Sequence, residues 1–398
     1  MKRICRIVAL LIVALLLTGC TNTPNPKTDI STGWRNIGSH TFTISDEGCY
    51  YVVDFHFLYF ADTSNGISVC LCSRPGCRHD KEEDVTKLPL CDAYLEECDL
   101  RCKLFVWGDH LYFLGSDAYG PNLYRRDTTG MNEKIVAELC EDHIKRKESV
   151  IIRDFIHIGD AVYYIANVKL LETGETSDYY TVRWIDLNTY KDQEVVKGNL
   201  ELFAANQDGI LFQSYDTVDL DFSDPNYAEE ARKAKTELKF WDRKTGQITT
   251  VLTSTLGEFG RVTAVDQNYV YYLRGTDSCT IQYNMDTGEH REIGSWMKQI
   301  NGHYAFHDEE KDYALYDLRT GKKLPVKLKA DSISVQSVSE EAVILETNKL
   351  HPNSNRMESS TYNYVKLASL ADGLQERDLL ELYTYYYKEP ATSVDDLK

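Results

Sequence analysis

The sequence lacks an excess of basic residues and, beyond its N-terminus, any long apolar run. Of 398 residues, 44 are Lys or Arg and 62 are Asp or Glu, so the formal net charge is -18. A surface that binds nucleic acid needs clustered cations, so this balance argues against DNA or RNA as a partner. No later run reaches the roughly 20 apolar residues that span a bilayer. With 42% hydrophobic residues, the chain can still bury a large core.

The first twenty residues are typical of an export signal. A short cationic start precedes an unbroken apolar run at residues 7–17. The run is too short for a permanent membrane anchor but has the length of a signal peptide. It ends in the letters LTGC at 17–20, which resemble the lipobox of bacterial lipoproteins. The resemblance implies that Cys20 is lipidated after removal of residues 1–19.

The segment after Cys20 is polar. Residues 20–34 contain Asn, Thr, Pro, Lys and Asp and few apolar side chains, a composition that predicts a flexible tether. We therefore expect residues 35–398 to form the folded part. We expect it to be anchored to the cell membrane by the lipid on Cys20, on the extracytoplasmic face.

An internal repeat occupies most of the remaining chain. Seven triplets of apolar and aromatic residues, most of them after a turn signal, begin at Leu58, Leu111, Val162, Ile210, Val270, Tyr304 and Val343. Other short strands surround each triplet, and the average spacing of roughly 48 residues is close to that of propeller blades. A sandwich would not repeat one strand order seven times. The pattern predicts an all-β fold, a β-propeller of seven four-stranded blades.

Two features of the repeat carry a family resemblance. The letters DGILF at 208–212, and a polar turn ending in Thr-Gly at 240–246, 283–288 and 316–321, resemble TolB-type and more distantly WD40-like propellers. Together with the lipobox, they resemble lipoproteins of Gram-positive anaerobes. The resemblance implies the propeller architecture but no particular activity. To close the ring, we expect either the Tyr-rich tail at 379–387 or a strand at 40–44 to complete a blade of the opposite terminus.

Six of the eleven cysteines lie between residues 70 and 102, which predicts a small cysteine-rich insertion after the first blade. Within it, the letters CSRPGCRHD at 72–80 are similar to a Cys-x-x-Pro-x-Cys-x-His segment of the same lipoproteins. Three thiolates and one imidazole would bind a tetrahedral metal, most plausibly zinc. The exported location favours disulfides instead, with fifteen pairings that the sequence does not rank. The candidate residues are Cys72, Cys77, His79 and Cys91.

The functional prediction rests on the fold and on missing motifs. The sequence contains no Gly-x-Ser-x-Gly, no His-Glu-x-x-His and no glycine-rich phosphate loop. We therefore expect a module that binds a protein or glycan ligand through loops at one mouth of the ring, without catalysis. Two alternatives stay open at this point: a carbohydrate-active or other hydrolytic propeller, and a metal-binding or redox module built on the cysteines.

Overall fold

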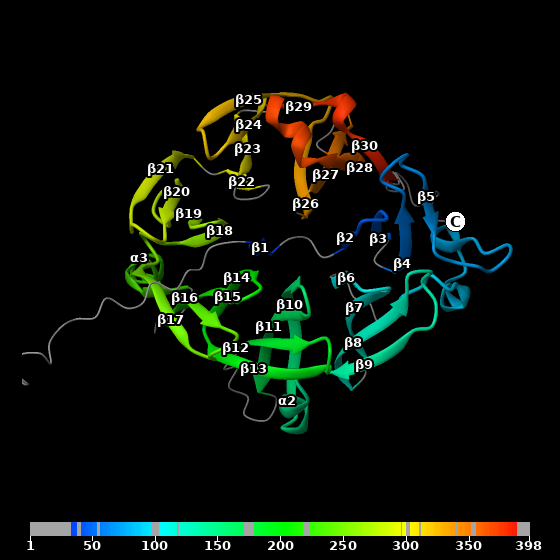
Figure 1. Cartoon of the computed structure of the whole chain (residues 1–398), viewed down its shortest axis with the longest axis horizontal. Coiled ribbons are helices and arrows are strands. Elements are labelled where there is room, and N and C mark those ends of the chain that lie inside the picture. Colours follow the sequence, from blue (N-terminus) through cyan, green and yellow to red (C-terminus); the bar gives the residue numbers. More distant parts are fainter. Residues whose placement is uncertain are drawn as a thin grey trace, which may run out of the picture. The chain divides into compact units, whose positions relative to one another are not determined.

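The computed structural model describes residues 33–37, 41–53, 56–96, 103–117, 119–170, 179–217, 223–295, 297–299, 303–309, 312–339, 341–351 and 356–387. Within these residues the strands form seven sheets arranged as blades around a central axis (Figure 1). This confirms the predicted seven-bladed β-propeller. The predicted signal peptide, the lipidation site Cys20 and the tether up to residue 32 lie outside the described residues. No helix in the described ranges is long and apolar enough to cross a membrane.

The first four blades follow one another along the chain. Blade one contains β2 (Phe42–Ile44), β3 (Cys49–Val53), β4 (Phe57–Ala61) and β5 (Ser68–Cys70). Blade two contains β6 (Lys103–Trp107), β7 (His110–Asp117), β8 (Gly120–Asp127) and β9 (Lys134–Glu138). Blade three contains β10 (Glu148–Ile158), β11 (Ala161–Leu170), β12 (Tyr179–Asp186) and β13 (Lys191–Gly198). Blade four contains β14 (Leu200–Asn206), β15 (Gly209–Tyr215), β16 (Lys235–Asp242) and β17 (Ile248–Thr255), joined at its inner edge by β1 (Arg35–Asn36).

The last three blades continue the same order until the final strand. Blade five contains β18 (Arg261–Asp266), β19 (Tyr269–Leu273), β20 (Thr280–Asn284) and β21 (His290–Gly294). Blade six contains β22 (Lys298–Gln299), β23 (Tyr304–Glu309), β24 (Asp312–Asp317), β25 (Lys322–Lys327) and the short parallel strand β29 (Leu374–Gln375). Blade seven contains β26 (Ser332–Val338), β27 (Ala342–Leu350), β28 (Met357–Lys366) and β30 (Leu380–Tyr386).

Helices are short and lie between strands. The α-helices are α2 (Glu141–Lys145) and α3 (Tyr227–Lys233). The 3-10 helices are η1 (His79–Lys81), η2 (Val85–Leu90), η3 (Leu367–Asp372) and η4 (Glu376–Asp378).

The predicted triplets mark the second strand in six of the seven blades. These strands are buried because the sheets on either side cover both of their faces, so their apolar residues do not alternate with polar ones. In blade one the prediction was wrong by one strand. Leu58 begins the triplet of the third strand, β4, whereas the equivalent second strand is β3, whose residues are all buried. The third strand is unusually apolar here because the cysteine-rich segment lies against it, with the Leu58 amide donating to the carbonyl of Ala93 at 2.9 Å.

The Thr-Gly turns share one geometry that explains their recurrence. In blade four, the Asp242 carboxylate accepts hydrogen bonds from the amides of Lys244 at 2.9 Å and Thr245 at 2.8 Å. Gly246 then adopts a φ of +69°, the left-handed region that favours glycine. The turns after Asn284 and Asp317 repeat the side-chain contacts. Each turn therefore fixes the hairpin between the third and fourth strands of its blade.

The ring closes without an exchanged strand in the described ranges, which corrects the expectation from sequence. The Tyr-rich tail forms β30, the outer strand of its own blade seven, and residues 42–44 form β2, the inner strand of blade one. Side chains join the two blades: the rings of Phe42 and Tyr362 have centroids 4.9 Å apart. The carbonyl of Leu382 accepts a hydrogen bond of 2.6 Å from the Ser68 hydroxyl. We call this contact between blades one and seven the closing seam.

Candidate functional site

The cysteine-rich segment connects β5 of blade one to β6 of blade two, as predicted, and Figure 1 draws it in blue beside β5. Its described part is residues 71–96; Cys98 and Cys102 lie outside the described residues. The segment begins with a tight turn. Pro75 and Gly76 occupy its two central positions, Gly76 has a φ of +75°, and the Cys77 amide donates to the Arg74 carbonyl at 3.3 Å. This is the residue pattern of a type II turn, and it brings Cys77 back beside Cys72.

Two short helices supply the remaining candidate residues. His79 opens η1, and Cys91 directly follows η2, where its amide donates to the carbonyl of Leu88 at 3.0 Å. The Asp84 side chain caps η2 by accepting from the amide of Thr86. The two helices thus place the imidazole of His79 and the thiol of Cys91 beside the two thiols, of Cys72 and Cys77, that the first turn brings together.

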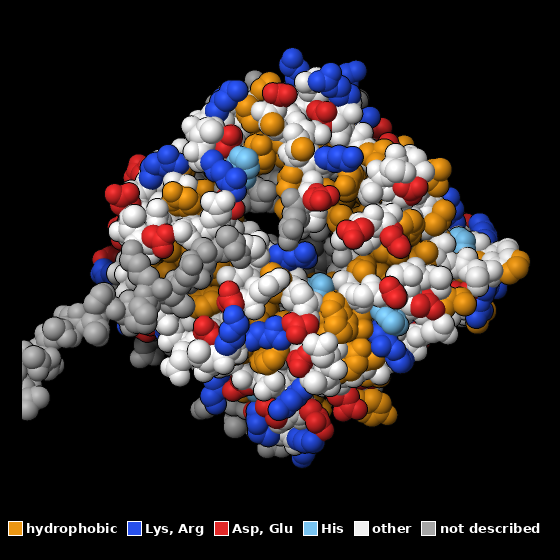
Figure 2. Space-filling view, viewed as in Figure 1, with side chains coloured by type: hydrophobic (Ala, Val, Ile, Leu, Met, Phe, Trp, Pro, Cys, Tyr) orange, Lys and Arg blue, Asp and Glu red, His pale blue; other side chains and the backbone are white. Residues whose placement is uncertain are grey.

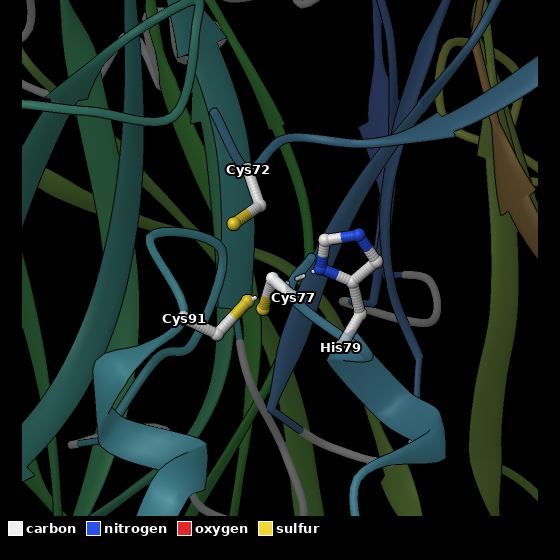
Figure 3. A group of neighbouring side chains, drawn as sticks. All are labelled: Cys72, Cys77, His79 and Cys91. Atoms are coloured by element: carbon white, nitrogen blue, oxygen red, sulfur yellow. Dashed lines mark hydrogen bonds between the residues drawn. The ribbon is translucent and has the colours of Figure 1, made fainter. Parts of the chain in front are cut away.

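The four predicted residues converge on one point (Figure 3). One ligand atom from each of Cys72, Cys77, His79 and Cys91 lies within 4.8 Å of all the others. The Cys91 sulfur is 3.5 Å from Nδ1 of His79. In a tetrahedral zinc site with Zn–S bonds of about 2.3 Å, ligand atoms lie roughly 3.5–4 Å apart. The donor set and spacing therefore fit zinc, and we call these four residues the Cys3His centre.

All seven cysteines in the described part of the chain are free thiols. Any disulfide within the Cys3His centre would use two of its sulfurs and leave the third thiol and the imidazole facing each other. A metal would use all four. The convergence of His79 with three sulfurs, which the disulfide interpretation does not explain, thus favours the metal.

The thiols of the centre differ in their acidity. Partial burial raises the pKa of Cys72, but hydrogen bonds from the backbone near Arg74 and Asp92 and from the Cys91 and Cys77 thiols outweigh it, so the net pKa lies below the usual value. Burial raises the pKa of the Cys91 thiol. A bound divalent ion would stabilise both as thiolates, since metal binding releases the thiol protons.

Contacts outside the four residues anchor the centre to the propeller. Asp92 accepts from Ser73 at 2.8 Å and from Arg74 at 2.8 Å. The buried Arg126 of blade two donates to the carbonyls of Asp92 at 2.7 Å and Tyr94 at 2.8 Å. On the other side, the Tyr59 hydroxyl of blade one donates to Asp80 at 2.6 Å. The sequence of the segment does not reveal these supports, because Arg126 and Tyr59 lie on blade strands outside it.

A second candidate site lies on the axis of the ring. A cavity of about 700 Å³ is lined by β1, β2 and the inner strands of several other blades. Figure 2 shows the opening, with cationic and histidine side chains at its rim. The described acidic, basic and histidine side chains that line it are Arg35, His157, Asp266, His303 and Arg319. Its lining is thus more basic than the protein as a whole, whose net charge is -18.

The charges of the cavity are distributed unevenly. Asp266 accepts two hydrogen bonds from Arg319, at 2.9 and 3.2 Å, which neutralises both groups. Arg35 is exposed and has no ion-pair partner within the described ranges. Burial and the nearby positive charge of Arg35 lower the pKa of His157 to about 4, so this imidazole is neutral at pH 7. The sequence analysis did not identify Arg35, because its role depends on β1 crossing the axis to pair with β14.

The cavity lacks the carboxylate pair that a glycosidase needs. Such enzymes place two carboxylates about 5–10 Å apart across the scissile bond. Among the described residues lining the cavity, Asp266 is the single carboxylate, and one of its oxygens accepts both hydrogen bonds from Arg319.

Comparison with known proteins supports the fold. No family model and no curated protein matches the sequence. A puromycin-hydrolyzing peptidase of Mycobacterium tuberculosis superposes with a TM-score of 0.56 at 10% identity, over 93% of this chain and 56% of the peptidase. The acylaminoacyl peptidase of Pyrococcus horikoshii superposes with a TM-score of 0.53 at 10% identity, over 92% of this chain and 53% of that one. This chain spans about half the length of these peptidases. At such identity the likeness shows the propeller fold alone.

Proposed function

We propose that this protein is a lipid-anchored binding propeller on the extracytoplasmic face of the cell membrane, that its central cavity takes a small anionic ligand, and that zinc in the Cys3His centre is structural. The single observation that carries the proposal is the Arg35 guanidinium in the central cavity, which has no ion-pair partner among the residues that the structure describes. A volume of about 700 Å³ suits a small ligand. A carboxylate-bearing sugar would satisfy Arg35 and accept hydrogen bonds from neutral polar groups around it.

The donor set supports a structural rather than a catalytic role for zinc. Catalytic zinc sites keep one coordination position for water, whereas closed sites of four Cys and His ligands stabilise a fold. The Cys3His centre supplies four ligands, and it lies in a segment with few buried apolar side chains.

Replacing Arg35 by glutamine is expected to weaken binding of an acidic sugar at least tenfold, because the other guanidinium described in the cavity, Arg319, is already paired with Asp266. Titration calorimetry would compare glucuronic acid with glucose, which differ in the carboxylate, on wild type and variant. Arg232→Gln, which removes an exposed arginine on α3, is the matched control and should leave affinity unchanged. Equal binding of both sugars, or equal affinity of the Arg35 variant and wild type, would contradict the anionic ligand.

The membrane anchor has its own test. Changing Cys20 to alanine is expected to move the protein from the membrane fraction to the soluble exported fraction, because the acyl chains are attached to that sulfur. Detergent phase partitioning of the expressed full-length chain measures this. Cys5→Ala, within the predicted signal, serves as the control and should stay anchored. A Cys20→Ala protein that still partitions with the membrane would exclude lipidation at this residue.

A further inference from the structure

A group of polar residues that the functions above do not use lies on blade three, where Figure 1 places α2 beside the strands β10–β13. Asp142 and His143 come from α2, and Glu194 comes from β13. One donor atom from each lies within 4.8 Å of the others. His143 is 1% exposed, so its imidazole is buried among these carboxylates.

One neighbour fixes the orientation of the imidazole. Nδ1 of His143 lies 2.6 Å from the Glu148 carboxylate. Arg146 donates to that carboxylate at 3.1 and 3.2 Å and also lies 2.8 Å from Nδ1, and the Tyr179 hydroxyl is 3.3 Å from it. The shorter of these contacts, 2.6 Å to the Glu148 carboxylate, assigns the proton to Nδ1, and Arg146, which can only donate, then makes no hydrogen bond to this nitrogen. A carboxylate that holds the far nitrogen in this way is the usual support of a metal-binding histidine, because it leaves the lone pair of Nε2 for the metal.

The Nε2 atom is buried but has no hydrogen-bond partner among the described residues. It faces carboxylate oxygens of Glu194 at 3.4 Å and Asp142 at 3.6 Å. In this tautomer a lone pair and two carboxylates point at one another, and each would repel the others. A cation between them removes that repulsion, and buried polar atoms without partners are rare in folded proteins.

A second unpartnered atom borders the same space. Arg183 binds Asp142 at 3.1 Å and Asp192 at 3.0 Å through Nη2. Its buried Nη1 lies 3.8 Å from Glu194 and has no hydrogen-bond partner in the described part of the chain. Three protein donors leave a tetrahedral ion one position for water. The oxygen of such a water would give Nη1 the acceptor that it lacks.

The local charge balance also favours a divalent ion. Four carboxylates, Asp142, Glu148, Asp192 and Glu194, meet two guanidiniums, Arg146 and Arg183, which leaves two net negative charges around the imidazole. One imidazole with two carboxylates suits a first-row transition cation better than magnesium or calcium, which prefer oxygen ligands alone. We propose that Asp142, His143 and Glu194 bind a divalent transition-metal ion, separate from the Cys3His centre.

Zinc and cobalt are the probes for this site. The mature full-length chain is expected to bind two equivalents of zinc, one of which is lost in His143→Gln and in Glu194→Gln while the other is lost in Cys77→Ser. Cobalt distinguishes the two sites, since thiolate ligands give intense charge-transfer absorption and nitrogen and oxygen ligands do not. Glu148→Gln should weaken the His143 site by about 10–100-fold through the lost support of Nδ1.

The control for these variants is Glu141→Gln, which removes an exposed carboxylate of α2 that is paired with Lys145. It should retain both equivalents. The side chain of Glu194 is 36% exposed, so the Glu194→Gln protein is expected to fold. Circular dichroism checks that it is folded. A folded Glu194→Gln or His143→Gln protein that binds as much zinc as wild type would overturn the proposal. So would a single equivalent in wild type that disappears with Cys77→Ser.

Discussion

Replacing Cys77 by serine is expected to abolish zinc binding at the Cys3His centre and to unfold residues 71–96 while the seven blades stay folded. In this segment the buried side chains are Cys91, Ala93 and Leu95, whereas Val85 is 71% exposed and Leu90 is 55% exposed. So small a core does not offset the conformational entropy of ordering the segment. Structural zinc contributes about 10–16 kcal/mol in isolated zinc-finger domains, and Cys77→Ser removes one of the four ligands on which such a contribution depends.

Limited proteolysis with mass spectrometry measures this effect. Wild type should resist cleavage between residues 71 and 96, and the Cys77→Ser protein, or wild type treated with a chelator, should be cut there first. Cys279→Ser is the matched control, because this part-buried thiol of blade five donates to the Gly294 carbonyl and lies outside the Cys3His centre. Cleavage that begins elsewhere, or a wild-type protein without metal whose Cys72 and Cys91 resist alkylation until reduced, would contradict the zinc centre and favour disulfides.

The sequence predicted the architecture because each blade repeats the same physical constraints. A second strand covered on both faces must be apolar, and a hairpin that ends in a left-handed residue favours glycine, so Tyr271 and Gly246 each belong to a pattern that recurs. The error in blade one has the same origin. Both β3 and β4 are rich in aromatic residues, and without knowledge of the segment packed on β4 the two strands cannot be told apart.

The candidate sites differ in how close together in the sequence their residues lie. The Cys3His centre was predictable because its ligands lie within twenty residues of one another. Cysteine and histidine seldom occur so close together without binding a metal or forming disulfides. The group around His143 was not, since Glu194 reaches it from a strand fifty residues later and Glu and Asp are frequent on any surface. The cavity depends on β1, a two-residue strand without a sequence signal, which places Arg35 on the axis of the ring.

Changing Leu382 to alanine is expected to destabilise the whole propeller by about 2–5 kcal/mol, the usual range for a fully buried leucine. Leu382 is 4% exposed and belongs to the apolar cluster of the closing seam. Its carbonyl also accepts from the hydroxyls of Ser68 at 2.6 Å and Tyr51 at 3.4 Å. Denaturant unfolding measures the loss. Tyr386→Ala, on the same strand but 70% exposed, is the matched control and should change stability by less than about 0.5 kcal/mol.

The closing seam is the contact between blades where the loss of a buried side chain should destabilise the ring most. The other six contacts between blades join sheets that are consecutive in the chain, so the connecting segment keeps the two blades tethered when such a contact is weakened. Blades one and seven have no such tether, and in the described residues no strand is shared between them. Leu382→Ala should therefore raise the unfolding rate more than an equal truncation between consecutive blades, such as Ile185→Ala in the cluster between blades two and three. Equal unfolding rates for the two variants would mean that the seam is still closed in the transition state for unfolding.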